Sequence, residues 1–219
     1  MLGLSAIEKY GFSPFIDGSC RREPDFENPY PSISSLCRQS VFAPHLQEND
    51  IIIYITVGGK FKPYKEGHHL VAILQVEEVY DSHEIAWNEY KKRNLPLPSN
   101  CMVSNNLPLD FDKTSGDYKS VLEQKKFLSR NDRQKMKIGE KRLRLWDKNY
   151  QKKSKEWPCF IKTKPIYINL INPIQILRSD FNSIFGKLPN TRMPKKINKE
   201  QLIRIGRLAG LEINILPKA

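Results

Sequence analysis

The sequence contains no apolar run that approaches the roughly 18 residues of a membrane-spanning helix, so an integral membrane protein is not expected. Its first residues, Met1 to Glu8, lack a basic segment and become polar too early for a secretory signal peptide. These two absences predict a cytoplasmic protein with no membrane partner.

Cysteine is scarce, and the spacing of the cysteines does not match the common paired motifs. Cys20, Cys37, Cys101 and Cys159 are 17, 64 and 58 residues apart. No two of them form a Cys-x-x-Cys pair, which is the spacing typical of zinc knuckles and redox sites. Reduced thiols are therefore expected, rather than disulfides or a structural zinc site.

Motifs of the common enzyme classes are also missing. The chain has no P-loop, no dinucleotide-binding fingerprint, no Gly-x-Ser-x-Gly elbow and no His-Glu-x-x-His motif. Of the 4 histidines only His68 and His69 are adjacent, and neighbours on a strand point to opposite faces, so they would not ligate one metal ion. No catalytic residue, metal or cofactor is therefore assigned from the sequence.

Positive charge is abundant, and most of its excess lies in one quarter of the chain. Lys and Arg number 36 against 24 Asp and Glu, a formal net charge of +12. Residues 111–165 contain 17 of these basic and 7 of the acidic residues, or +10, which leaves 19 − 17 = +2 for the rest. This distribution favours a polyanionic partner, nucleic acid above all, although a solvated basic helix would give the same pattern.

The basic segment is expected to form a helical insertion at about residues 111–157. Its pattern predicts two helices, 117–129 and 138–155, separated by the polar residues 130–137. Leu143, Trp146 and Tyr150 recur at three- and four-residue intervals, which gives the second helix a narrow apolar face. The side chains expected to bind phosphates are Lys125, Lys126, Lys141, Arg142, Arg144 and Lys148.

The rest of the chain predicts strands and helices of a single domain, residues 1–219. β-Branched and aromatic runs predict strands, and capping residues ahead of helically spaced apolar residues predict helices. The expected strands are 50–57, 70–80, 160–170, 174–178 and 212–216, and the expected helices are 32–40, 81–92 and 198–208. Strands at both ends of the chain favour one closed α+β unit, a mixed β-barrel flanked by helices and carrying the basic helical insertion.

Aromatic residues crowd the loops before the first long strand and indicate a pocket at the mouth of the barrel. A flipped-out base is held by stacking on aromatic rings while hydrogen bonds read its edge. Phe12 and Tyr54 would supply such rings, although any single ring is more often part of the core. The polar side chains expected at the same mouth are Asp17, Arg21, Arg38 and Thr56.

Residues spread over positions 10–115 follow the order found in a known group of domains. They are Gly11-Phe12-x-Pro14, Gly18-x-Cys20, Pro24, Pro31-x-Ile33, Arg38, Asp50 to Tyr54, Val71 to Val76 and Leu97 to Val103. This order resembles the nucleotide-modification-associated domains, which are similar to the EVE, ASCH and YTH domains of the PUA-like superfamily. The resemblance implies a PUA-like barrel that recognises a modified or flipped base in DNA or RNA modification, restriction or phage defence. It also implies that Trp87, on a helix after the second strand, borders the base pocket.

Three functions fit these features. The first is a non-catalytic nucleic-acid-binding module, in which the pocket gives base preference and the basic helices give affinity. The second is a nucleotide-acting enzyme, a nuclease or a base-modifying protein, that depends on Asp17 or Glu23 in the acidic first loop. The third is a protein-interaction module whose basic helices bind an acidic partner in a modification or defence system. The sequence does not distinguish DNA from RNA.

Overall fold

The structure is a computed structural model that describes residues 13, 15–17, 19–60, 64–109, 132–188 and 193–211. For residues 132–143 it describes the backbone alone. Expected elements that fall elsewhere, the helix at 117–129 and the strand at 212–216, lie outside the described residues. Within the described part of the chain, no helix is both long enough and apolar enough to cross a membrane.

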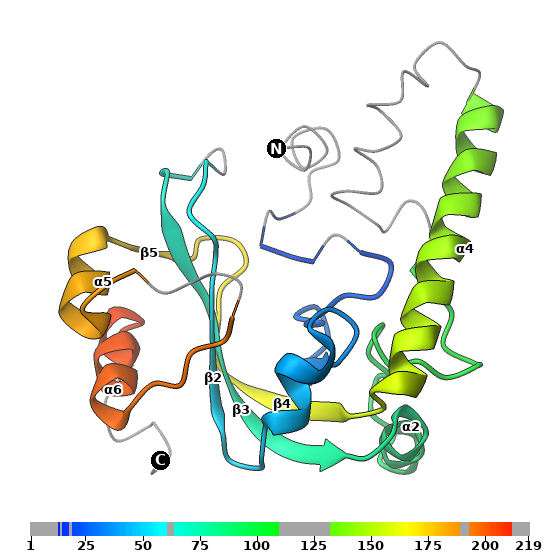
Figure 1. Ribbon diagram of the computed structural model, residues 1–219, viewed down its shortest axis with the longest axis horizontal. Coiled ribbons are helices and arrows are strands. Elements are labelled where there is room, and N and C mark those ends of the chain that lie inside the picture. Colours follow the sequence, from blue (N-terminus) through cyan, green and yellow to red (C-terminus); the bar gives the residue numbers. More distant parts are fainter. Residues whose placement is uncertain are drawn as a thin grey trace.

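One antiparallel sheet of five strands forms the centre of the fold (Figure 1). Its longest strand pairs along one edge with a single neighbour and along the other edge with two, one after the other. The strands are β1 (Ser32–Ser34), β2 (Ile51–Ile55), β3 (His68–Tyr80), β4 (Phe160–Ile168) and β5 (Ile174–Ile176), in the order β1-β4-β3-β2 with β5 also paired to β3.

The sheet is open, so the expected closed barrel is wrong, while the α+β class is confirmed. β1 and β2 are the two ends of the sheet, and they do not pair with each other among the described residues. The first residues of the long strand β3, His68 to Leu70, pair with β5, and the stretch from Ala72 to Tyr80 pairs with β4. Because β3 divides its length between two partners and its register with β4 shifts twice, the sheet twists and bends without closing.

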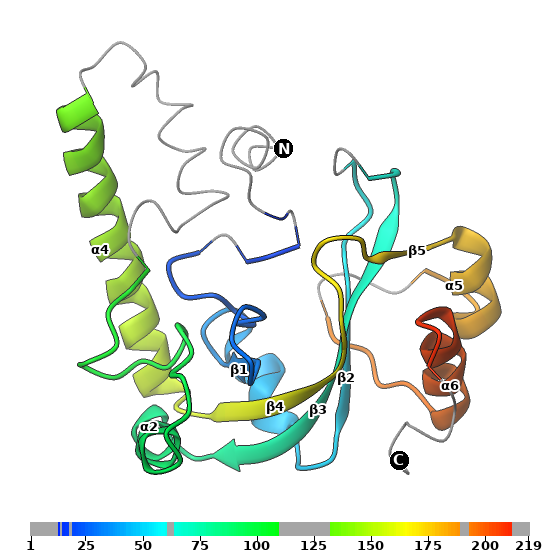
Figure 2. The ribbon, with the colours of Figure 1, turned by 180° about the vertical axis from the view of Figure 1, so that it is seen from behind.

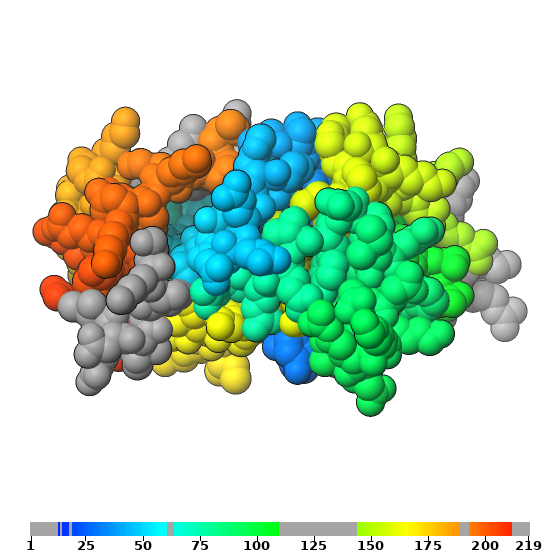
Figure 3. All heavy atoms as spheres, turned by 90° about the horizontal axis from the view of Figure 1, so that it is seen from below, coloured from blue at the N-terminus to red at the C-terminus, as the bar shows by residue number. Residues whose placement is uncertain are grey.

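Helices cover the two ends of this sheet (Figures 1 and 2). At one end lie α5 (Arg178–Phe185) and α6 (Lys199–Leu208), and at the other lie α2 (His83–Lys92) and α4 (Asp132–Glu156). Figure 3 shows the same division on the surface, with β2 between α6 and α2. Helix α4 runs along the outer edge of the molecule, which leaves one side of it toward solvent.

Apolar residues pack on both faces of the sheet. One face carries Ile52, Val71 and Leu74 and is covered by Phe15 and Phe26 from the first loop. The opposite face is covered by α5 and α6, whose buried residues join those of β3 and β5; the cluster is Leu70, Ile73, Ile176, Phe181, Ile184 and Ile205. Alternation along β3 is interrupted at Val71, where the register with β2 shifts between Ala72 and Leu70, so that Val71 and Leu74 share one face and Leu70 and Ile73 the other.

Several local predictions are confirmed and one is wrong. Ser82 caps α2 and Asn198 caps α6, as their positions before apolar helical spacing indicate. The expected helix at 32–40 is not formed, because Ser32 to Ser34 pair with Lys162 to Phe160 as β1. The short 3-10 helices η1 (Gln39–Val41) and η2 (Ala43–His45) follow that strand.

Candidate functional site

Helix α4 is attached to the rest of the protein along one side by a buried ion pair and apolar contacts. Arg21 Nε lies 2.7 Å from Asp147 Oδ1, and the two side chains are only 2% and 9% exposed. Tyr150 is buried in one apolar cluster with Leu36. The Lys153 ammonium donates a hydrogen bond of 2.7 Å to the Leu36 carbonyl. These contacts fix which side of α4 faces solvent.

The solvent side of α4 carries a row of basic residues. An α-helix turns about 100° per residue, so positions three or four apart lie close together on one face. Arg144, Lys148, Lys152 and Lys155 are all exposed and fall within an arc of about 80° on this helical geometry. Backbone positions 137 and 141 fall in the same arc. We call Arg144, Lys148, Lys152 and Lys155 the basic row, which is about 17 Å long at 1.5 Å per residue.

A hollow of about 320 Å³ opens beside the C-terminal half of α4. Three aromatic residues line it, Trp146, Tyr150 and Trp157. The rings of Trp146 and Tyr150 are stacked, with centroids 6.2 Å apart and 24° between their planes. Tyr150 is buried, whereas the two indoles are half-buried, so tryptophan supplies the ring surface that a ligand would meet.

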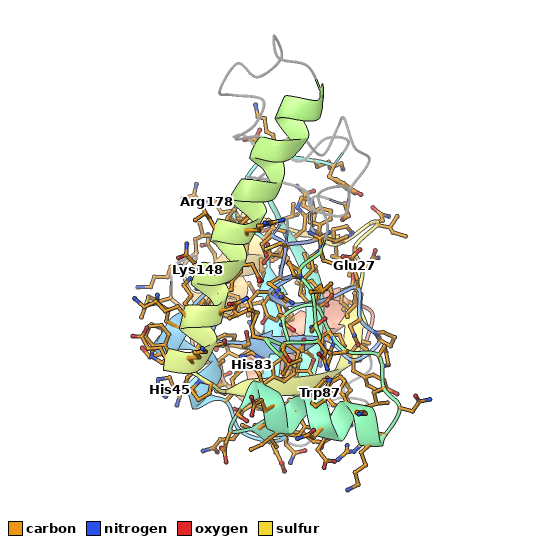
Figure 4. The ribbon with its side chains drawn as sticks, turned by 90° about the vertical axis from the view of Figure 1, so that its right-hand side faces the viewer. Glu27, His45, His83, Trp87, Lys148 and Arg178 are labelled. Carbon is orange, nitrogen blue, oxygen red and sulfur yellow. The ribbon has the colours of Figure 1, made fainter. Side chains whose placement is uncertain are left out.

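Polar side chains complete this hollow. Gln39 of η1 and Asn149 of α4 contribute carboxamides, each of which can both donate and accept hydrogen bonds. Lys152 and Lys153 outnumber the one carboxylate on the lining, Glu156, so the hollow has a positive balance. Since Lys152 also belongs to the basic row, the row leads directly into the hollow. The labelled Lys148 marks the row in Figure 4.

The expected pocket residues Asp17 and Arg21 instead stabilise the first loop. The Asp17 carboxylate accepts hydrogen bonds from the backbone N–H groups of Ser19 and Glu23, both at 2.9 Å. Arg21 forms the buried pair with Asp147 described above. Burial raises the pKa of Asp17, against the hydrogen bonds from Ser19 and Glu23, which lower it. Both side chains are committed to contacts within the protein.

Glu23 forms the centre of this polar region. Its carboxylate accepts hydrogen bonds from the backbone N–H and the hydroxyl of Ser34, at 2.6 and 2.5 Å, and from Asn100 Nδ2 at 3.1 Å. Burial raises the pKa of Glu23 from 4.5 to about 8, although the hydrogen bonds oppose the shift. The carboxylates on which an enzyme would depend, Asp17 and Glu23, thus tie the first loop to β1 and to residue 100.

Glu23 and Arg38 both act electrostatically on Tyr54, which also packs against Phe26. The Phe26 ring packs edge-on against Tyr54, with centroids 5.2 Å apart, and is itself part of the core. Burial raises the pKa of Tyr54 well above its usual value, the Glu23 charge raises it further, and Arg38 lowers it. Arg38 itself is exposed, directly before η1.

The remaining predicted pocket residues lie elsewhere. Thr56 follows the far end of β2, where its hydroxyl oxygen accepts a hydrogen bond of 2.9 Å from the His69 backbone N–H. Trp87 lies on α2, packed against the cluster around Tyr80, with the Lys91 ammonium 5.2 Å from its ring centroid (Figure 4). Phe12 lies outside the described residues. The structure therefore brings Asp17 and Tyr54 within electrostatic range of Glu23 and Arg38 within that of Tyr54, while Arg21, Thr56 and Trp87 make the separate contacts described above.

Of the predicted phosphate-binding residues, some lie in or beside the basic row and others do not. Arg144 and Lys148 are exposed in the basic row, and position 141 continues it. Position 142 falls on another side of the helix by the same register. Lys125 and Lys126 lie outside the described residues.

The two adjacent histidines point to opposite faces of the sheet, as predicted. The His68 ring packs on Phe181, at 4.9 Å between centroids, and the His69 ring lies 5.5 Å from that of Phe15. Among the residues that the structure describes, no group of three or more His, Cys, Asp or Glu side chains could hold a metal ion.

Sequence reasoning missed the hollow although it identified part of its lining. Trp146 and Tyr150 were predicted as an apolar face, and Trp157 continues that series at helical spacing, which is a signal that the sequence offered. Gln39 carried no such signal, because it reaches the hollow from η1, with a positive φ of 52°.

Comparison of the chain with protein-family models, curated proteins and solved structures gives no match to any of them.

Proposed function

We propose that this protein is a nucleic-acid-binding module that contacts phosphates through the basic row of α4. The observation that carries the proposal is the alignment of the exposed cations Arg144, Lys148, Lys152 and Lys155 on the side of α4 that faces away from the body. The resemblance to nucleotide-modification-associated, PUA-like domains supports the same class of partner. A place in DNA or RNA modification, restriction or phage defence is part of this proposal.

The α4 surface suits such a partner better than the region beside Tyr54. The described strands form an open sheet, and the Phe26 ring packs edge-on against Tyr54, with centroids 5.2 Å apart. Asp147, an acidic residue of α4, is buried and its charge is neutralised by Arg21. Among the side chains of α4 that the structure describes, the exposed cations Arg144, Lys148, Lys152 and Lys155 therefore form a positive surface on this side of the helix.

Phosphate contacts have a characteristic dependence on salt. Each phosphate that a cation neutralises releases condensed counterions, so log K falls with log salt concentration by about 0.9 per contact on duplex DNA and about 0.7 on a single strand. Replacing cations that contact phosphate must therefore lower both the affinity and this slope.

The test is a salt titration of a triple variant, Arg144→Gln, Lys148→Gln and Lys155→Gln. These positions are exposed and do not line the hollow, so folding and the hollow are preserved. Binding to a short DNA duplex and to an oligothymidylate of the same length is measured by fluorescence anisotropy. We expect the salt slope to fall by about 2 to 3 for the loss of three contacts.

A matched control removes the same charge from the other end of the molecule. Lys187, Lys196 and Lys199 are exposed near α5 and α6, and their replacement by Gln should leave the slope unchanged. If the α4 variant keeps the wild-type slope, the proposal fails. If both variants lower the slope equally, binding depends on net charge and α4 has no special part in it.

A further inference from the structure

We infer that the hollow beside α4 takes an unpaired base, so that the protein prefers single-stranded nucleic acid to duplex. This inference rests on the proposed function and adds to it the class of nucleic acid. It assigns the hollow a separate role from the basic row, which holds the phosphates of either form.

The size and the rings of the hollow fit one base. Its volume of about 320 Å³ is at the small end of the range for ligand pockets. Trp146 and Trp157 are half-buried, so part of each indole is accessible from the hollow. Every base has a π face that stacks on an aromatic ring, and that face is covered in a duplex. A base can enter only when it is unpaired and unstacked.

The polar lining matches the other parts of a nucleotide. The carboxamides of Gln39 and Asn149 offer donors and acceptors for a base edge. Lys153 is fixed at the wall by its bond to the Leu36 carbonyl and lies 5.5 Å from the Tyr150 ring centroid. Lys152 stands where the hollow meets the basic row, the position in which it would contact the phosphate of the bound nucleotide.

An acidic peptide fits this lining less well. It would pair with Lys152 and Lys153, but its carboxylates would also meet the carboxylate of Glu156. Charge complementarity and ring surface together favour a nucleic acid strand that enters from the row with its base turned into the hollow.

Tryptophan fluorescence tests the inference directly. The chain has 3 tryptophans, and the change Trp87→Phe, on α2, leaves Trp146 and Trp157 as the reporters, both at the hollow. In this background oligothymidylate should quench the fluorescence at saturation, whereas a duplex of the same length should bind and leave it unchanged. This measurement requires no alteration of the hollow.

A variant of the hollow then separates the two forms of nucleic acid. Trp157→Ala should weaken oligothymidylate binding by about 5- to 150-fold, the loss that corresponds to one stacked base, and leave duplex binding unchanged. Trp157→Phe keeps a ring and should retain part of the affinity. If Trp157→Ala does not fold, the quenching measurement and Trp157→Phe still decide the matter.

The outcomes separate the inference from the proposed function. If oligothymidylate and duplex bind equally well and neither quenches the two tryptophans, or if the Trp157 variants weaken both alike, the base site is ruled out while phosphate binding by α4 stands. If instead the triple variant of the basic row binds both forms like the wild type, the proposed function fails, whatever the hollow does.

Discussion

At the scale of single residues, Glu23 couples the stability of the first loop to pH. Its buried carboxyl group accepts hydrogen bonds from Ser34 and Asn100, and burial raises its pKa from 4.5 to about 8. The folded state therefore binds a proton at Glu23 more tightly than the unfolded state does. The stabilisation from Glu23 is complete below pH 4.5 and is lost as the pH rises to about 8.

Replacement of Glu23 by Gln should flatten this part of the pH profile. Wild-type protein is expected to lose on the order of 2–4 kcal/mol of unfolding free energy through this group between pH 5 and pH 8.5. Glu23→Gln has no group that titrates at this position, so most of that loss should be absent from the variant. Urea unfolding at the two pH values measures the difference. Glu48→Gln, at an exposed carboxylate, is the control and should follow the wild type. A Glu23→Gln profile as steep as that of the wild type contradicts the prediction.

The buried pair of Arg21 and Asp147 makes a second prediction at this scale. Asp147→Ala leaves the Arg21 charge buried with no carboxylate beside it, which should cost about 3–5 kcal/mol in urea unfolding. The comparison is Glu200→Ala, which breaks the 2.8 Å pair with Arg204 on the surface of α6 and should cost about 0.5 kcal/mol or less. Equal losses in the two variants would show that Asp147 does not hold α4 in place.

At the scale of elements, local signals explain what the sequence predicted and non-local pairing explains what it did not. β2 and β3 are β-branched runs bounded by turns, and α2 and α6 have capping residues, so each was expected close to its observed position. The segment 32–34 has helix-capping chemistry in Ser32, but its pairing with β4, more than 100 residues away, decides its structure. Propensity within a short window carries no information on such a partner.

The N-terminal cap of helix α6 should contribute measurably to stability. The Asn198 side chain accepts a hydrogen bond of 2.9 Å from the Gln201 backbone N–H, and Gln201 Oε1 accepts one of 3.1 Å from the Asn198 backbone N–H. Asn198→Ala should therefore cost about 0.5–2 kcal/mol and lower the thermal midpoint. Lys199→Ala, one residue further along, leaves both bonds intact and should have little effect. A thermal midpoint for Asn198→Ala equal to that of Lys199→Ala would show that this cap does not limit stability.

At the scale of the whole molecule, the basic row could be predicted because it lies on one helix. The hollow could not, because two distant segments form it. The basic row follows from the count of charges and from helical spacing, both of which can be read from the sequence. The hollow also needs Gln39, which lies more than 100 residues before Trp146 and reaches it only through the docking of α4 on the first loop. The expected closed barrel is wrong for the corresponding reason, since the closure of the sheet depends on pairing between distant strands.

Taken together, the buried titratable groups of the described residues predict greatest stability on the acid side of neutrality. Burial raises the pKa of Glu23 to about 8 and also raises that of Asp17 and Asp25, so these groups reduce stability as the pH rises above 4.5. Burial lowers the pKa of His83 from 6.5 to about 4, so its stabilisation is lost as the pH falls through that range. Although burial opposes the shift, hydrogen bonds from Arg93 and Lys162 lower the pKa of Glu78 to about 2.

These opposing pKa shifts determine how the free energy of unfolding should vary with pH. Between pH 4.5 and 6.5 the contributions of Glu23 and His83 oppose each other, so the free energy of unfolding should change less steeply there than between pH 6.5 and 8. It should decline toward pH 8 because of the buried carboxyls and toward pH 2 because of Glu78. Urea unfolding across this range measures the curve. His83→Gln should make the free energy of unfolding fall as the pH rises from 4.5 to 6.5, because the opposing contribution of His83 is gone, whereas Glu23→Gln should flatten the decline between pH 6.5 and 8. Maximum stability at pH 8 or above would contradict the assignment, since the buried carboxyls would then be ionised in the folded protein without cost.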